Sequence, residues 1–106
     1  MVIEVQIRDW GVKRVLIDPG SSADVLYWEA FKGMGFEPNE LLPFSGTLVG
    51  FSGEQVQVLG YLPALTTFGD GGSAKTVQVR YLVVNASSPY NTIIGRPSFN
   101  SLEAVP

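Results

Sequence analysis

The sequence contains no cysteine and no histidine. The absence of cysteine excludes a disulfide framework, a thiol nucleophile and a thiolate metal site. The absence of histidine excludes Ser-His-Asp and Cys-His catalytic arrangements, and with them nearly all zinc sites. Acid–base chemistry is therefore left to carboxylate, lysine and tyrosine side chains.

Charge is also scarce, at 16% of the residues, and 7 Lys and Arg against 10 Asp and Glu give a net charge of −3. Because nucleic-acid binding needs a basic patch, we expect this domain to bind no nucleic acid. No run approaches the ~20 apolar residues of a membrane span, and the N-terminus lacks the pattern of a signal peptide. We expect no membrane association and an intracellular, cytoplasmic protein.

The 106 residues are enough for one compact domain, residues 1–106, and too few for two. Hydrophobic residues make up 45% of the chain, with 12 Gly and 7 Pro, which is typical of a globular domain rich in turns. Apolar alternation and turn residues predict strands at 3–8, 12–17, 47–51, 55–59, 61–68, 76–84 and 92–94. A Ser N-cap and an apolar face predict a helix over 22–32, and Pro97 predicts a short final helix. The pattern favours a mostly β fold, a small closed barrel with one main helix.

The segment Gly69-Asp70-Gly71-Gly72-Ser73-Ala74 matches the spacing of a dinucleotide-binding loop. Such a loop must open a helix. Here a predicted strand follows, so we expect a hairpin turn instead.

Three short segments carry candidate chemistry. Asp18 directly follows the aliphatic run Val15-Leu16-Ile17 and begins the turn Asp18-Pro19-Gly20-Ser21. By itself this placement also suits an Asp that only caps turn N–H groups. A glycine-tipped hairpin follows around Ser52-Gly53, and a second aliphatic run, Thr92-Ile93-Ile94-Gly95-Arg96, lies near the C-terminus.

An Asp-x-Gly turn, a hairpin and an Ile-Ile-Gly-Arg segment, in this order, resemble the retropepsins, the single-domain aspartic proteases of retroviruses and retrotransposons. The segments that begin at Leu16, Leu48 and Asn91 look like those of plant gypsy-type retrotransposon polyproteins, or of a host gene derived from one. The likeness covers nearly the whole chain. It implies a retropepsin-like barrel and an aspartic endopeptidase that cuts a retroelement polyprotein, with no metal and no cofactor.

The resemblance implies that Asp18 is catalytic. One chain supplies one such Asp, so the implied enzyme is a homodimer with Asp18 of each subunit at the two-fold axis. Two adjacent carboxylates share one proton. One then activates a water as general base while the other protonates the scissile carbonyl.

The resemblance also assigns the residues around Asp18. Gly20 permits close approach of the two active-site turns, and Ser21 lines the carboxylates. Ile93, Ile94 and Gly95 support the turn and line the pocket, and Arg96 ties the final helix to the dimer contact. The substrate-binding flap, which clamps an extended polypeptide, consists of Gly50, Phe51, Ser52, Gly53 and Glu54.

Pro19 departs from the family, which usually has Thr or Ser at this position. In retropepsins that hydroxyl and N–H join the two active-site turns across the dimer axis, and proline supplies neither group. An inactive or weakened retropepsin-like domain for dimerisation or peptide binding therefore remains open, as does a β-barrel interaction module without an active site. The chain stops at Pro106, soon after the predicted last helix. We therefore expect a fragment of a longer polyprotein.

Overall fold

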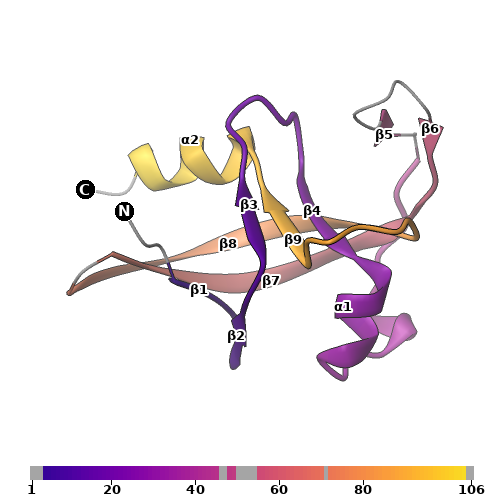
Figure 1. Ribbon diagram of the computed structural model, residues 1–106, viewed down its shortest axis with the longest axis horizontal. Helices are drawn as coiled ribbons and strands as arrows, with labels where there is room; N and C mark the ends of the chain where they lie inside the picture. Colours follow the sequence, from indigo (N-terminus) through magenta and orange to yellow (C-terminus); the bar gives the residue numbers. More distant parts are fainter. Residues whose placement is uncertain (1–3, 46–47, 50–54, 71, 105–106) are drawn as a thin grey trace.

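A long antiparallel hairpin of β7 (Val58–Asp70) and β8 (Ser73–Val84) forms the spine of the fold (Figure 1). The computed structural model describes residues 4–45, 48–49, 55–70 and 72–104. The two strands pair up to Asp70 opposite Ser73. This pairing confirms a hairpin turn where the glycine spacing resembled a dinucleotide-binding loop.

Five shorter strands complete a seven-stranded sheet. They are β1 (Glu4–Ile7), β2 (Trp10–Val12), β3 (Val15–Ile17), β4 (Asp24–Tyr27) and β9 (Thr92–Ile94). The pairing order is β2-β1-β7-β8-β4-β9-β3, and the sheet curls into a half-barrel. A second sheet pairs β5 (Leu48–Val49) with β6 (Gln55–Val56). The prediction of a mostly β fold is thus confirmed.

The predicted strand over 12–17 is interrupted between β2 and β3. Arg14 has a φ of 54°, in the left-handed region that side chains rarely adopt, so the chain cannot continue as a strand there. The Arg14 carbonyl accepts the N–H of Asn91 at 2.9 Å, and the Asn91 side-chain amide donates to the Lys13 carbonyl at 2.8 Å. The break therefore anchors the loop that leads into β9.

Three helical segments accompany the sheet, namely α1 (Trp28–Gly33), the 3₁₀ turn η1 (Pro38–Glu40) and α2 (Arg96–Ala104). In Figure 1 the two α-helices lie on opposite sides of β3, β4 and β9. The C-terminal helix has 9 residues and α1 only 6, so the predicted order of their lengths was wrong.

The predicted helix over 22–32 was wrong in its first half, which forms β4. Val25 and Leu26 are buried between β8, which pairs parallel with β4, and β9, which pairs antiparallel. Strand partners on both sides outweigh the weak helical preference of this segment. The helical spacing that begins at Tyr27 does describe α1, where Phe31 is fully buried.

The main core fills the concave side of the curled sheet. Its buried side chains are Val5, Ile7, Leu26, Phe31, Phe36, Leu62, Ala64, Phe68, Val77, Val79, Tyr81, Val83 and Ile94. Phe31 lies between Trp28 and Phe36, with ring centroids 5.2 and 5.6 Å away. These contacts fix α1 and the segment after it against the sheet.

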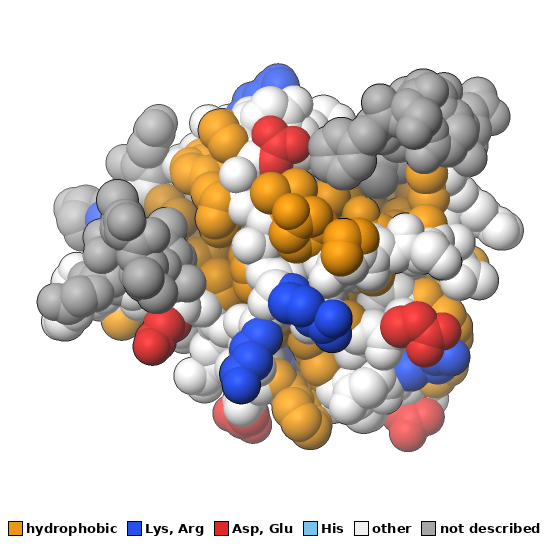
Figure 2. All heavy atoms as spheres, in the orientation of Figure 1, with side chains coloured by type: hydrophobic (Ala, Val, Ile, Leu, Met, Phe, Trp, Pro, Cys, Tyr) orange, Lys and Arg blue, Asp and Glu red, His pale blue; other side chains and the backbone are white. Residues whose placement is uncertain are grey.

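One face of the molecule carries acidic and basic side chains interspersed around a hydrophobic centre (Figure 2). No large patch of one charge sign is visible on this face, in keeping with the low charge content of the chain. No helix in the described part of the chain is long and apolar enough to cross a membrane.

Candidate active site

Asp18 directly follows β3, at the end of a parallel strand pair. Ile17 lies opposite Ile94 in the register of β3 with β9, so both strands end at the same level. Asp18 donates its backbone N–H to the Ile94 carbonyl at 2.9 Å and thereby extends the pairing by one residue. The buried sheet therefore fixes the main chain of Asp18.

The turn after Asp18 is closed by hydrogen bonds to the same residue. The Ser21 N–H donates to the Asp18 carbonyl at 3.0 Å, and the Gly20 N–H donates to Asp18 Oδ1 at 3.0 Å. A Cβ on Gly20 would lie 3.2 Å from that carboxylate oxygen, which is tighter than ordinary contact. Asp18 is half-buried whereas Pro19 and Gly20 are exposed, so the turn presents a fixed carboxylate at the surface.

Ser21 braces the loop internally. Its hydroxyl donates to the Ala23 carbonyl at 2.8 Å and accepts the Ala23 N–H at 3.4 Å. The Ser21 carbonyl accepts the N–H of Arg96 at 2.9 Å. These contacts join the loop to the start of α2.

Strand β9 lies between the strand that enters the Asp18 loop and the strand that leaves it. It pairs parallel with β3 and antiparallel with β4, and Ile93 and Ile94 are both buried. A Cβ on Gly95 would lie 2.3 Å from the Ala23 carbonyl oxygen and 2.9 Å from that of Ser21. Only glycine fits where the loop crosses the end of β9.

Arg96 contacts the same loop from α2. Its guanidinium lies 3.5 Å from the Gly20 carbonyl oxygen. Together with the hydrogen bond from its N–H to Ser21, this contact ties the helix to the turn that carries Asp18. What Arg96 does at a dimer contact stays a prediction.

Asp24 is a site residue that the sequence analysis missed. It is 2% exposed, and its Oδ1 accepts the Gly95 N–H at 2.7 Å. Burial raises the pKa of its carboxyl, although the hydrogen bond from the Gly95 N–H and the nearby polar groups of Ser98 oppose this effect. The predicted helix over 22–32 included Asp24, but no helix begins there.

The proposed flap residues, 50–54, lie outside the described residues. The strands on either side of them, β5 and β6, pair antiparallel with Leu48 opposite Val56 and Val49 opposite Gln55. The prediction of a hairpin at this place is therefore confirmed, whereas a role for it in substrate binding stays a prediction.

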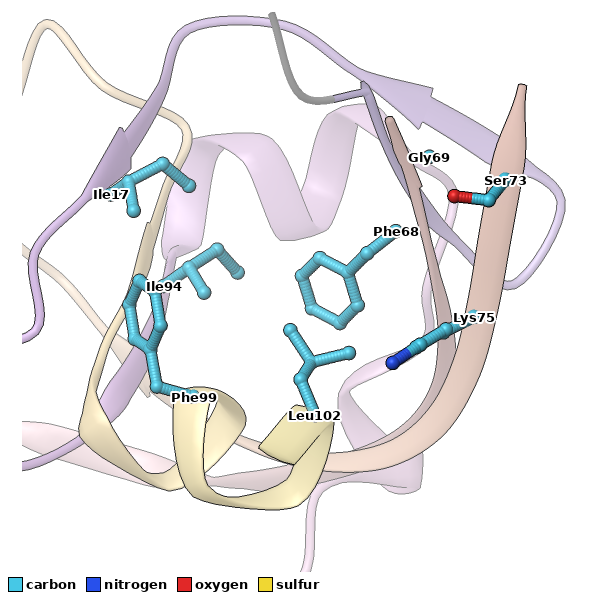
Figure 3. A pocket seen from close by; sticks show the side chains of 8 residues that line it. All are labelled: Ile17, Phe68, Gly69, Ser73, Lys75, Ile94, Phe99 and Leu102. Atoms are coloured by element: carbon cyan, nitrogen blue, oxygen red, sulfur yellow. The ribbon is translucent and has the colours of Figure 1, made fainter. Parts of the chain in front are cut away.

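An apolar cavity of about 300 Å³ lies beside the strand ends (Figure 3). The residues that line it are Ile17, Phe68, Gly69, Ser73, Lys75, Ile94, Phe99 and Leu102. Figure 3 shows Phe99 and Leu102 of α2 turned toward Ile17, Ile94 and Phe68. None of these described lining residues carries a carboxyl group. Within the described residues, no group of three acidic side chains suits a metal ion.

The fold is matched among solved structures, whereas no family model and no curated protein sequence matches the chain. One similar structure is the EIAV protease complexed with the inhibitor HBY-793, at a TM-score of 0.63. The identity is 23%, and the alignment covers 95% of this chain and 86% of that chain. A likeness of this kind shows the fold. The chain has a retropepsin-like fold, mostly β with two helices, as the sequence predicted.

Proposed function

We propose that this protein is an aspartic endopeptidase that acts as a homodimer. The observation that carries the proposal is the position of Asp18. Its main chain is held by Ile94 of the sheet, its carboxylate is held by the Gly20 N–H, and the turn around it is exposed. The similarity of the fold to that of the EIAV protease complexed with the inhibitor HBY-793 supports this proposal.

The chemistry needs a second carboxylate, and a second copy of the chain supplies it. The only other acidic side chain described near the turn, Asp24, is buried and engaged with Gly95. Pro19 and Gly20 are exposed, so the turns of two chains can meet around a two-fold axis. Because adjacent carboxylates share one proton, one accepts a proton from water while the other donates one to the scissile carbonyl.

We further propose that the substrate is an extended polypeptide, bound by strand-like pairing under the hairpin of β5 and β6. In this proposal the flap is residues 50–54, and the pocket support is Ile93, Ile94 and Gly95. The likeness of the Asp18 segment to gypsy-type polyproteins supports a retroelement polyprotein as the origin of the chain and as its substrate. No metal or cofactor takes part.

Cleavage of a peptide library, read by mass spectrometry between about pH 4 and 7, tests the proposal. We expect cleavage by the wild-type protein and none by Asp18→Asn. Asp9→Asn is the matched control, because Asp9 is exposed in the turn between β1 and β2. This variant should cleave the peptides like the wild-type protein. Equal cleavage by Asp18→Asn would contradict the assignment of Asp18.

A second candidate function, a catalytically inactive dimerisation or peptide-binding domain, is favoured by Pro19. Proline offers no N–H and no hydroxyl to the partner's turn. A pair of missing hydrogen bonds weakens a dimer by about 1–3 kcal/mol for each partner left unpaired. Peptide binding without cleavage by the wild type, and cleavage by Pro19→Thr, would favour this second function.

A further inference from the structure

Asp24 is a buried carboxyl group that the proposed reaction does not use. It is the first residue of β4, six positions after Asp18, and it lies opposite Tyr81 in the pairing of β4 with β8. Burial disfavours its charged form. Because burying a carboxyl group is costly, we expect hydrogen bonds to compensate for its burial.

The contacts of Asp24 converge on the junction between β9 and α2. Its Oδ1 accepts the Gly95 N–H at 2.7 Å, and Gly95 is the residue directly before the first turn of α2. No side chain can replace the hydrogen of Gly95, because the Ala23 carbonyl oxygen lies 2.3 Å from the place of a Cβ. The junction therefore has one position relative to the loop, and Asp24 holds it there.

Two backbone hydrogen bonds connect the residues beside Gly95 to the turn that begins at Asp18. The residue before Gly95, Ile94, accepts the Asp18 N–H at 2.9 Å, and the residue after it, Arg96, donates to Ser21 at 2.9 Å. These bonds hold the first and the last residue of the active-site turn. A shift of Gly95 would move both of them, and a displacement of about 1 Å at a reacting group can lower a rate about 100-fold.

We propose that Asp24 is a positioning residue of the site, whose carboxylate locks Gly95 and the start of α2 and thereby sets the position of the Asp18 turn. This inference rests on the proposed function, because the position of Asp18 matters for catalysis only if Asp18 is catalytic. The lock itself is a property of the fold and is measurable without activity.

The ionised carboxylate of Asp24 is the form that suits this role, although burial raises the pKa of the group. The groups near its carboxyl are the Gly95 N–H, Ser98 of α2 and Tyr81 of β8, and it borders a surface pocket of about 400 Å³ that Arg80 also lines. The Arg80 guanidinium stacks 4.6 Å from the Tyr61 ring. An ionised carboxylate is an acceptor at both oxygens, so it accepts the Gly95 N–H whichever oxygen faces it. A protonated one turns an acceptor into a donor and loses part of the lock.

The test compares Asp24→Asn, Asp24→Ala and the control Ser101→Ala, which changes another residue of the same pocket. Steady-state kinetics should show kcat reduced about 100-fold in Asp24→Ala with a smaller change in KM. Asp24→Asn should lose less, since its side-chain oxygen still accepts the Gly95 N–H. In Asp24→Asn the decrease of kcat at acid pH should also lack the contribution from protonation of Asp24.

Amide hydrogen exchange provides the readout that does not depend on activity. In Asp24→Ala the amides of Gly95 and Asp18 should exchange faster, whereas the amide of Val79 in β8 should keep its wild-type rate if the fold is intact. Unchanged exchange at Gly95 and Asp18, or a wild-type kcat in Asp24→Ala, would overturn the proposal. If the wild type cleaves nothing but these two amides lose protection, the proposed function fails while the lock stands.

Discussion

Ile17 and Ile94 lie opposite each other in a parallel strand pair, so the residues that follow them, Asp18 and Gly95, emerge side by side at one edge of the sheet. The loop from Asp18 then crosses the end of β9 closely enough to exclude any side chain at Gly95. Two segments 77 positions apart in the sequence thus form one rigid unit around the half-buried carboxylate of Asp18.

Gly95→Ala should destabilise the protein strongly. A Cβ at this position meets the Ala23 and Ser21 carbonyl oxygens, which belong to the main chain and cannot swing aside. Overpacking of this kind costs about 1–3 kcal/mol or more. Chemical denaturation measures the loss, with Gly33→Ala as the control. A Cβ on Gly33 meets nothing within 4 Å, so Gly33→Ala should be at least as stable as the wild-type protein.

Tyr81→Phe should lower stability, because it removes the hydrogen-bond partner of the buried Thr66 hydroxyl. The Tyr81 and Thr66 hydroxyls are both buried and lie 2.8 Å apart. In Tyr81→Phe the Thr66 hydroxyl keeps only its 3.3 Å hydrogen bond to the Ala64 carbonyl. Loss of the other partner costs about 1–3 kcal/mol, so the loss should shrink when Thr66→Val removes this hydroxyl as well. Denaturant unfolding of the two single variants and the double variant gives the coupling. Additive losses would show that the hydrogen bond contributes nothing, and Tyr90→Phe at an exposed tyrosine serves as the control.

Asp24→Asn should flatten the dependence of stability on pH. Burial raises the pKa of Asp24 in the folded protein. The corresponding contribution to stability is complete below the ordinary Asp pKa, and it is lost as the pH rises through the raised value. Melting temperatures measured from about pH 3 to pH 7 should therefore fall less with rising pH in the variant than in the wild type. Parallel curves would contradict the assignment of this pH dependence to Asp24.

Glu40→Gln should change the pH dependence in the opposite sense. A hydrogen bond from Arg8, 2.7 Å from Glu40 Oε1, lowers the pKa of this carboxyl, helped by the Glu37 N–H. The pair contributes stability above the ordinary Glu pKa, and this is lost as the pH falls through the lowered value. Because both side chains are about one-third exposed, the effect should be small and should shrink further in high salt. If Glu40→Gln leaves the melting temperatures at acid pH unchanged, this ion pair does not contribute to stability.

The sequence predicted the parts of the site that depend on local pattern. The aliphatic run of β9 ends at Ile94 as expected, and Asp18 follows β3 directly. Short apolar runs that end in turn residues can be recognised from local sequence as strands followed by turns. The hairpin between Gly69 and Ala74 was predicted for the same reason.

The parts that depend on distant contacts were not predicted. The segment 24–27 was predicted as part of the helix over 22–32, but it pairs with β8 and β9 as a strand. The role of Asp24 depends on Gly95, 71 positions away, and no spacing rule connects them. A signal was present in the placement of an acid among Ala23, Val25 and Leu26, since a charge within an apolar run needs a partner.

The central claim is that two copies of Asp18 form one reaction centre, and mixing wild-type protein with Asp18→Asn tests it most directly. At a concentration that keeps the protein dimeric, an equal amount of Asp18→Asn should lower the cleavage rate of a fixed amount of wild type by about half, because half of the wild-type chains pair with an inactive one. Mixing with Asp9→Asn should cause no such loss. A cleavage rate that is unaffected by added Asp18→Asn, or no cleavage by the wild type at any concentration, would contradict the account.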